Sequence, residues 1–117
     1  MSAQNLSVEK NYNAYDITVH WKSSIKDKLI SITGRVKNNY VYTIRNLEIT
    51  ARGVDKDGKI ICTGNYDFFP EEITPGESKE FSIVFLCKEP IEKITFFYRH
   101  YFKGDKDMRD LNFGSFE

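Results

Sequence analysis

The chain has 117 residues, of which 40% are hydrophobic and 29% charged, a composition typical of one globular domain and too short for two. Lysine plus arginine equals aspartate plus glutamate at 17 each, so no field of one sign exists to attract phosphate backbones or anionic lipid. These values exclude a nonspecific nucleic-acid binder, and the lack of any apolar run of about 18 residues argues against membrane insertion by this segment.

Residues 1–13 are polar and irregular, and we expect them to form a flexible tail ahead of a single domain over residues 14–117. From Tyr15 onward, hydrophobic and polar residues alternate, which is the pattern of a strand with one buried face. The hydrophobic positions of this first predicted strand are Tyr15, Ile17, Val19 and Trp21. The sequence Lys26-Asp27-Lys28 then predicts a turn.

Two further strands follow with the same alternation. Their inward positions are Ile30, Ile32, Gly34 and Val36 in the first, and Leu47, Ile49, Ala51 and Gly53 in the second. The small residues at the end of the second strand indicate a bulge or a closely approaching backbone. The sequence Asp55-Lys56-Asp57-Gly58 predicts a hairpin, because Gly58 readily adopts the positive φ that such tips need.

The remaining strands lie on either side of the turn Thr74-Pro75-Gly76-Glu77. A fourth strand covers residues 59–65, and the fifth and sixth carry inward rows, which are Phe81, Ile83, Phe85 and Cys87, then Ile94, Phe96 and Tyr98. A weaker seventh strand is expected near Leu111 to Phe113, and no segment has helical periodicity. The sequence therefore predicts an all-β fold, an immunoglobulin- or fibronectin-III-like antiparallel β-sandwich of about seven strands.

The two cysteines, Cys62 and Cys87, lie in predicted strands on either side of the Pro-Gly turn. Two cysteines at this spacing form neither a disulfide-dense scaffold nor a zinc motif. A bridge between the strands and a pair of buried free thiols are both compatible with this placement.

The stretch from Ile30 to Phe85 resembles the FxLYD-type family of bacterial and archaeal immunoglobulin-like domains. Three segments carry the likeness, together with Phe81, and they are Gly34-Arg35-Val36-Lys37-Asn38-Asn39, Asp55-Lys56-Asp57-Gly58 and Thr74-Pro75-Gly76-Glu77-Ser78. Where the family has Phe-x-Leu-Tyr-Asp, this chain has Ala51-Arg52-Gly53-Val54-Asp55 and keeps only Asp55. The resemblance implies an accessory or interaction module of a cell-envelope or surface protein, without catalytic residues.

Candidate catalytic chemistry is sparse along the chain. His20 and His100 are the two histidines, and neither has a nucleophile motif nearby, so we expect them to be surface or structural residues. The carboxylates of Asp105-x-Asp107-x-x-Asp110 could hold a weak ion in a loop, although a solvated turn explains them better. We therefore predict no enzyme, no cofactor and no metal.

Aromatic residues make up 15% of the chain, more than one small sandwich can easily bury. Exposed rings stack on sugars or anchor protein partners. The candidate binding residues are Tyr40, Tyr42, Phe68, Phe69, Phe97, Arg99 and Tyr101. The simpler explanation is that some of these rings lie under the C-terminal segment or cover the edges of the sheets.

Three functions fit these observations. The first is a noncatalytic immunoglobulin-like module that binds a protein or separates domains at the cell envelope, and the second is a carbohydrate-binding module. The third is a small protease inhibitor that presents the loop Tyr66-Asp67-Phe68-Phe69-Pro70. The partner is thus a protein or a glycan, the chain a monomer or weak homodimer, and the location extracytoplasmic or, alternatively, cytoplasmic.

Overall fold

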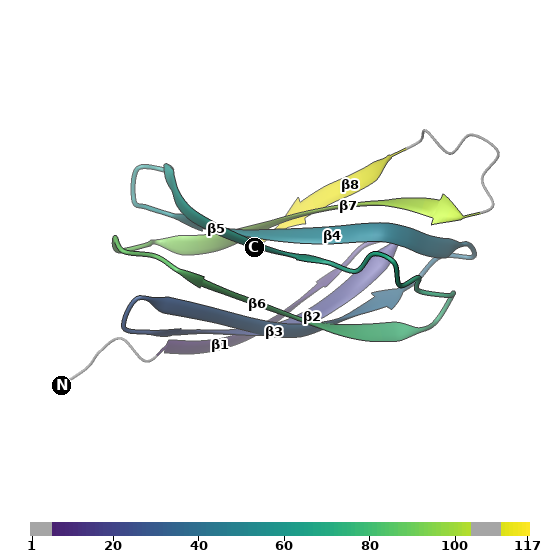
Figure 1. Cartoon of the computed structure of the whole chain (residues 1–117), viewed down its shortest axis with the longest axis horizontal. Coiled ribbons are helices and arrows are strands. Elements are labelled where there is room, and N and C mark those ends of the chain that lie inside the picture. Colours follow the sequence, from purple (N-terminus) through teal and green to yellow (C-terminus); the bar gives the residue numbers. More distant parts are fainter. Residues whose placement is uncertain (1–5, 104–110) are drawn as a thin grey trace.

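The computed structural model describes residues 6–103 and 111–117, and it shows eight antiparallel strands and no helix in these residues (Figure 1). No helix in the described part of the chain could therefore cross a membrane. The strands are β1 (Leu6–Asn13), β2 (Ile17–Lys26), β3 (Leu29–Asn38), β4 (Thr43–Val54), β5 (Ile60–Asp67), β6 (Ser78–Leu86), β7 (Lys93–Lys103) and β8 (Asn112–Phe116).

The strands form two four-stranded sheets that pack face to face (Figure 1). One sheet has the order β1-β2-β3-β6 and the other the order β5-β4-β7-β8. Without β1, the remaining strands make the three-plus-four arrangement of an immunoglobulin- or fibronectin-III-like sandwich. The predicted fold class is confirmed, and the weak seventh strand is present as β8. The acidic loop at Asp105 to Asp110 lies outside the described residues.

The expected flexible tail is wrong for residues 6–13, which form β1. This strand pairs with β2 along its whole length, from Leu6 opposite Ile25 to Asn13 opposite Thr18. The polar sequence of β1 gave no sign of a strand, because an edge strand is held by backbone hydrogen bonds on one side and needs few apolar contacts. One of those contacts comes from Tyr12, whose ring stacks on Phe116 of β8 at a centroid distance of 4.6 Å.

The core lies between the sheets and is built from the inward rows that alternation predicted, together with Ile44 and Ile73, which no predicted row included. Strand side chains point to opposite faces in turn, so each strand contributes every second residue to one continuous apolar layer. The largest fully buried apolar members are Ile17, Val19, Ile30, Ile32, Val36, Ile44, Leu47, Ile49, Ile73 and Ile83. Around Trp21, the rings of Phe96 and Phe116 add an aromatic contact between the two sheets at 5.1 and 4.9 Å.

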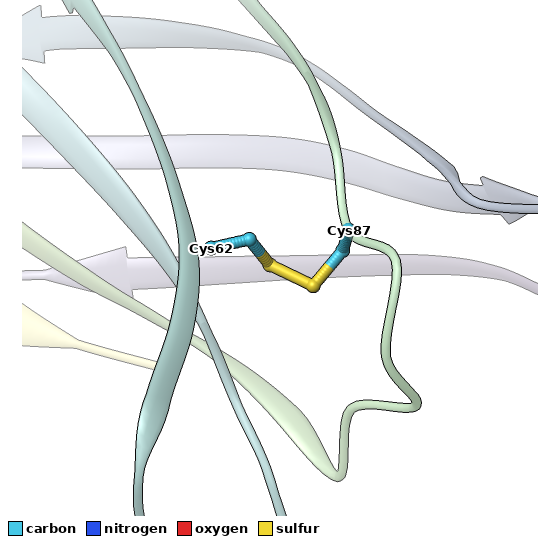
Figure 2. Close-up of a disulfide and its surroundings, with 2 residues drawn as sticks. All are labelled: Cys62 and Cys87. Atoms are coloured by element: carbon cyan, nitrogen blue, oxygen red, sulfur yellow. A yellow bond between two sulfur atoms is a disulfide. The ribbon is translucent and has the colours of Figure 1, made fainter.

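A disulfide joins Cys62 in β5 to Cys87 just after β6, so the bridge links the edge strands of the two sheets (Figure 2). Of the two possibilities that the sequence left open, the structure shows the bridge. It closes a loop with a sequence separation of 25, which by loop entropy stabilises the fold by about 3.5 kcal/mol. Gly53 lies directly against the bridge, and a Cβ at this position would come within 2.3 Å of the Cys62 sulfur.

The predicted turns are also present. At the β4–β5 hairpin, Asp55 accepts hydrogen bonds from the backbone N–H groups of Asp57 and Lys59, and Gly58 has φ +82°. At the Pro-Gly turn, Glu77 accepts hydrogen bonds from the backbone N–H and the hydroxyl of Thr74. These bonds hold the pKa of Glu77 below its ordinary value, because they stabilise the charged carboxylate.

Candidate functional site

Strand β7 divides the aromatic candidates between the interior and the surface. Tyr98, His100 and Phe102 point inward and are buried. Phe97, Arg99 and Tyr101 alternate with them and point away from the core, with Arg99 exposed and the two rings half-buried. One strand therefore contributes to two separate groups of residues.

The outer face of the β5-β4-β7-β8 sheet carries the first group. Across this face Phe97 pairs with Thr50 of β4, and Arg99 pairs with Glu48 of β4 and Phe113 of β8. The ring of Phe113 lies 6.0 Å from that of Phe97, and the guanidinium of Arg52 lies 5.8 Å above the Phe97 ring. Arginine and aromatic side chains on one flat sheet face are the composition of a recognition surface.

Sequence reasoning missed Phe113, although it is 63% exposed. The signal was present in the alternation of Phe113, Gly114, Ser115 and Phe116, which puts one phenylalanine outside and the other inside. The weak definition of the last strand left that assignment open.

A groove with a volume of about 360 Å³ opens at one end of this face. It is lined by Asn46, Glu48, Asp67, Phe69, Arg99, Tyr101 and Leu111. The groove lies where the pairing of β4 with β7 shifts between Arg45 and Glu48, and Asn46 takes up the extra length with φ +56°. Asparagine tolerates this left-handed conformation, and such a bulge redirects side chains away from the regular alternation.

Hydrogen bonds fix several of the polar side chains in the groove. Arg99 donates through Nε to Glu48 Oε1 at 3.0 Å, and its Nη2 forms an ion pair with the same oxygen at 2.9 Å. Asn65 donates to Glu48 Oε2 at 2.7 Å. Asp67 Oδ1 accepts the backbone N–H of Phe69 at 3.0 Å, which orients the segment after β5. The groove is thus a preformed arrangement of planar polar groups beside exposed rings.

Phe68 does not belong to any binding surface, contrary to the sequence prediction. It is 2% exposed, its backbone N–H donates to the carbonyl of Leu47, and its ring lies 4.8 Å from that of Tyr66. Phe69, next to it, is 66% exposed. Where two phenylalanines are adjacent at the end of a strand, their side chains point to opposite sides, so one ring is buried. The sequence alone does not show which ring this is.

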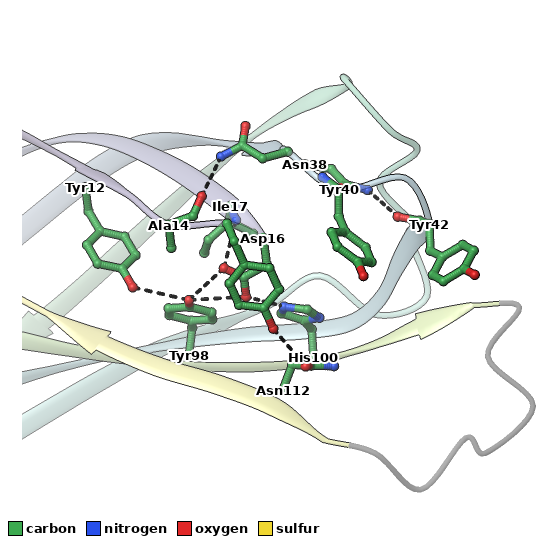
Figure 3. A network of polar contacts seen from close by, with 12 residues as sticks. Tyr12, Ala14, Asp16, Ile17, Asn38, Tyr40, Tyr42, Tyr98, His100 and Asn112 are labelled. Atoms are coloured by element: carbon green, nitrogen blue, oxygen red, sulfur yellow. Dashed lines mark hydrogen bonds and ion pairs between the residues drawn. The ribbon is translucent and has the colours of Figure 1, made fainter.

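Tyr40 and Tyr42 lie apart from the groove residues, in the β3–β4 connection (Figure 3). Tyr40 stacks on Phe102 at 4.5 Å and is flanked by Tyr15 and Tyr42 at 5.8 and 5.7 Å. Asn38 anchors this connection by donating to the carbonyls of Tyr42 and Ile73 and accepting the N–H of Tyr40. The seven predicted residues thus divide among the outer sheet face with its groove, the β3–β4 connection and the core.

The second group, inside the sandwich, is a polar network around Asp16 (Figure 3). Asp16 Oδ1 accepts hydrogen bonds from the backbone N–H of Ile17 at 2.9 Å and from the hydroxyl of Tyr98 at 3.1 Å. Its Oδ2 lies 2.9 Å from His100 Nε2, and the Tyr12 hydroxyl lies 3.4 Å from that of Tyr98. This network connects the start of β2 in one sheet with β7 in the other.

The electrostatics of the network follow from its burial and its partners. Burial alone would raise the pKa of Asp16, but the hydrogen bond and charge of His100 and the Tyr98 hydroxyl together lower it below the ordinary value. Burial, followed by the Tyr12 and Asp16 contacts, raises the pKa of Tyr98. Asp16 and His100 are 1% and 0% exposed, so the network is closed off from solvent within the core.

Comparison of the sequence with protein-family models and with curated proteins gave no match. Among solved structures, the fold is similar to that of pT26-6p, with a TM-score of 0.61 and 11% identity over 97% of this chain. This chain spans only 32% of pT26-6p, and at such identity the likeness shows the fold alone.

Two other solved structures are less similar. Bacteroides uniformis β-glucuronidase 2 has a TM-score of 0.45 and 16% identity, covering 93% of this chain and 12% of its own. The sporulation control protein Spo0M from Bacillus subtilis has a TM-score of 0.42 and 16% identity, covering 90% of this chain and 48% of its own. Neither value is high enough to bear on function.

Proposed function

We propose that this chain is a noncatalytic immunoglobulin-like binding module of a cell-envelope or surface protein. Its binding surface is the outer face of the β5-β4-β7-β8 sheet. The observation that carries the proposal is that Phe69, Phe97, Arg99 and Tyr101, four of the seven residues proposed from sequence, lie on this face or at its groove with Phe113. Rings and guanidinium groups on a rigid sheet bind a ligand with little loss of conformational entropy.

The disulfide supports an extracytoplasmic location. Structural disulfides persist in oxidising compartments and are rare in the reducing cytoplasm. Here the bridge links the two sheets, and Gly53 leaves the space that it occupies. The resemblance to FxLYD-type domains points to the same location. The cytoplasm is the alternative, and alkylation of thiols in intact cells distinguishes the two, because only reduced cysteines react.

The structure gives less support to a protease inhibitor. An inhibitory loop presents an extended, accessible segment to the protease, whereas Phe68 is buried in the core and hydrogen-bonded to Leu47. The residues on either side are also constrained, because Asp67 caps the turn through Phe69. A bait loop would have to release these contacts.

Binding of the fluorescently labelled chain to envelope preparations of its source organism tests the proposal. We expect binding by the unmodified chain and a loss of at least roughly tenfold in affinity when Phe69→Ser, Tyr101→Thr and Phe113→Thr are combined, because removing several anchors removes more than 1.4 kcal/mol. Threonine keeps the strand propensity of the two strand positions.

The opposite sheet offers a matched control. Leu29, Val84 and Leu86 are also exposed apolar residues, and they lie together on the outer face of β3 and β6. Replacing all three with threonine should leave envelope binding unchanged. Loss of binding in this control but not in the first variant would place the ligand on the β1-β2-β3-β6 sheet instead. No binding by the unmodified chain would contradict the proposed function.

A further inference from the structure

We propose that the groove at the end of the outer face binds a saccharide, an inference that rests on the proposed function and names the class of ligand for the same surface. The groove combines the two kinds of group that recognise a sugar ring. Aromatic faces pack against its C–H groups, and planar polar side chains exchange hydrogen bonds with its hydroxyls.

The apolar contacts come from three residues around the groove. Phe69 is 66% exposed, and Tyr101 and Leu111 line the same space. No ring contact joins Phe69 to Tyr101 among the described residues, so neither ring covers the face of the other. Both therefore have surface to offer to a ligand in the groove.

The polar side chains retain hydrogen-bonding capacity. Within the described residues, the side-chain amide of Asn46, the second carboxylate oxygen of Asp67 and Nη1 of Arg99 make no hydrogen bond. Together they supply donors and acceptors, and each hydroxyl of a sugar both donates and accepts. Their planar shapes suit neighbouring hydroxyl pairs, which bind carboxylate, amide and guanidinium groups at two points.

The charges of the groove favour a neutral ligand over an ionic one. Glu48 and Arg99 neutralise each other, at an Nη2–Oε1 distance of 2.9 Å. The remaining carboxylate in the groove is that of Asp67. The same sheet face also carries Arg45, because Arg45 pairs with Tyr101 across β4 and β7. No strong field of one sign is left to select a cation or an anion.

The position of the groove also argues against an extended peptide as the ligand. Peptides that extend a sheet bind through the free backbone groups of an edge strand. β4 and β7 are inner strands, and both edges of each are paired, with β5 and β7 for β4 and with β4 and β8 for β7. Between β4 and β7 the groove therefore has no free strand edge for a peptide to extend, and its volume of about 360 Å³ is near the lower end for small-molecule sites.

Two treatments of the envelope preparation separate a saccharide from a protein ligand. Proteinase K removes exposed protein, and periodate cleaves the vicinal diols of sugars. We expect binding of the unmodified chain to survive proteinase K and to be lost after periodate, and a glycan array to show binding to a defined group of saccharides.

Single variants test whether the groove itself holds the sugar. Tyr101→Thr removes one ring, and Asn46→Gly removes the amide while keeping a residue that accepts the positive φ. Each should weaken binding to the best array saccharide by roughly tenfold, the loss expected for one stacked ring or a pair of hydrogen bonds. Val84→Thr, at an exposed position on the outer face of the opposite sheet, should change it less than about twofold.

The outcomes distinguish this inference from the function on which it rests. Envelope binding that is lost after proteinase K and kept after periodate, with a blank array, would overturn the saccharide and identify a protein partner on the same face. Array binding that is unaffected by both groove variants would place the sugar elsewhere and also overturn the inference. No binding to the untreated envelope would instead remove the proposed function.

Discussion

The inward and outward sides of β7 differ in how completely their side chains are committed to contacts within the fold. Tyr98 and His100 are buried and share one carboxylate, Asp16, from the other sheet. Arg99 and Tyr101, each one residue away, lie at the surface in a shallow groove. The same alternation that locks one row into the core leaves the other row available to a ligand.

This contrast shows which residues hold the fold and which are available for function. A buried carboxylate is costly without hydrogen-bond partners, so removing a partner of Asp16 on the inner side should destabilise the fold. The outer side is solvated, and its residues can change without leaving an unpaired buried group. Substitutions on the two sides should therefore have opposite effects on stability and binding.

The largest effect is expected from Asp16→Ala, which leaves His100 Nε2 and the Tyr98 hydroxyl without their shared acceptor. Removing one member of a buried charged network destabilises a protein by about 3–5 kcal/mol. Urea unfolding of the variant should show this loss of unfolding free energy. Asp57→Ala, at the exposed hairpin tip, is the control and should change it by less than about 0.5 kcal/mol. Equal values for the two variants would contradict a structural role for the network.

A smaller effect should appear on acidification, because a protonated Asp16 keeps its shape and some of its hydrogen bonds. The pKa of Asp16 is lowered in the folded state, so its contribution is fully present above the ordinary value of 3.8 and is lost as pH falls through the folded pKa. The stability difference between the unmodified chain and Asp16→Asn should therefore shrink below about pH 4.

Glu77 has a lowered pKa as well and titrates in the same direction. The acid measurement should therefore be made in a Glu77→Gln background, which removes that contribution from both proteins. A difference between the unmodified residue and Asp16→Asn that stays constant down to pH 2 would show that Asp16 does not carry the acid dependence.

Tyr98→Phe should cost about 1.5 kcal/mol, because it deletes one hydrogen bond to a charged acceptor and leaves the ring in place. Tyr12→Phe is the matched control. Its hydroxyl meets that of Tyr98 at 3.4 Å, a longer and weaker contact, so the loss in unfolding free energy should be smaller. A larger loss for Tyr12→Phe would mean that the network is centred elsewhere.

The smallest effect on stability is expected on the outer side. Tyr101→Thr keeps a residue with high strand propensity at a half-buried position and should change the unfolding free energy by less than about 1 kcal/mol. Thermal or urea unfolding measures the change. A loss comparable to that of Asp16→Ala would show that Tyr101 is a structural residue instead.

Sequence reasoning recovered the fold because its signal is local. Alternation along Ile30 to Val36 and along Phe81 to Cys87 fixed which residues face the core, and the Gly58 and Gly76 turns fixed where strands end. The edge strand β1 escaped, since it is held by backbone pairing that leaves little trace in a polar sequence.

Both the buried network and the groove depend on contacts between segments that are far apart in the sequence, and the sequence did not show these contacts. Asp16 and His100 are 84 residues apart, and nothing in either local sequence indicates the other. The groove depends on the bulge at Asn46, and an asparagine in a strand sequence does not by itself indicate a bulge. Phe97, Arg99 and Tyr101 were predicted because the chain has more aromatic residues than one small sandwich can easily bury, and the alternation of β7 places all three outside the core.

The most direct test of the account compares Tyr98→Phe with Tyr101→Thr, measuring unfolding free energy and envelope binding for both. Tyr98→Phe should lower stability and, while folded, bind as the unmodified chain does. Tyr101→Thr should keep most of the stability and bind roughly tenfold more weakly. Full binding by folded Tyr101→Thr together with impaired binding by folded Tyr98→Phe would contradict the assignment of function to the outer side of β7.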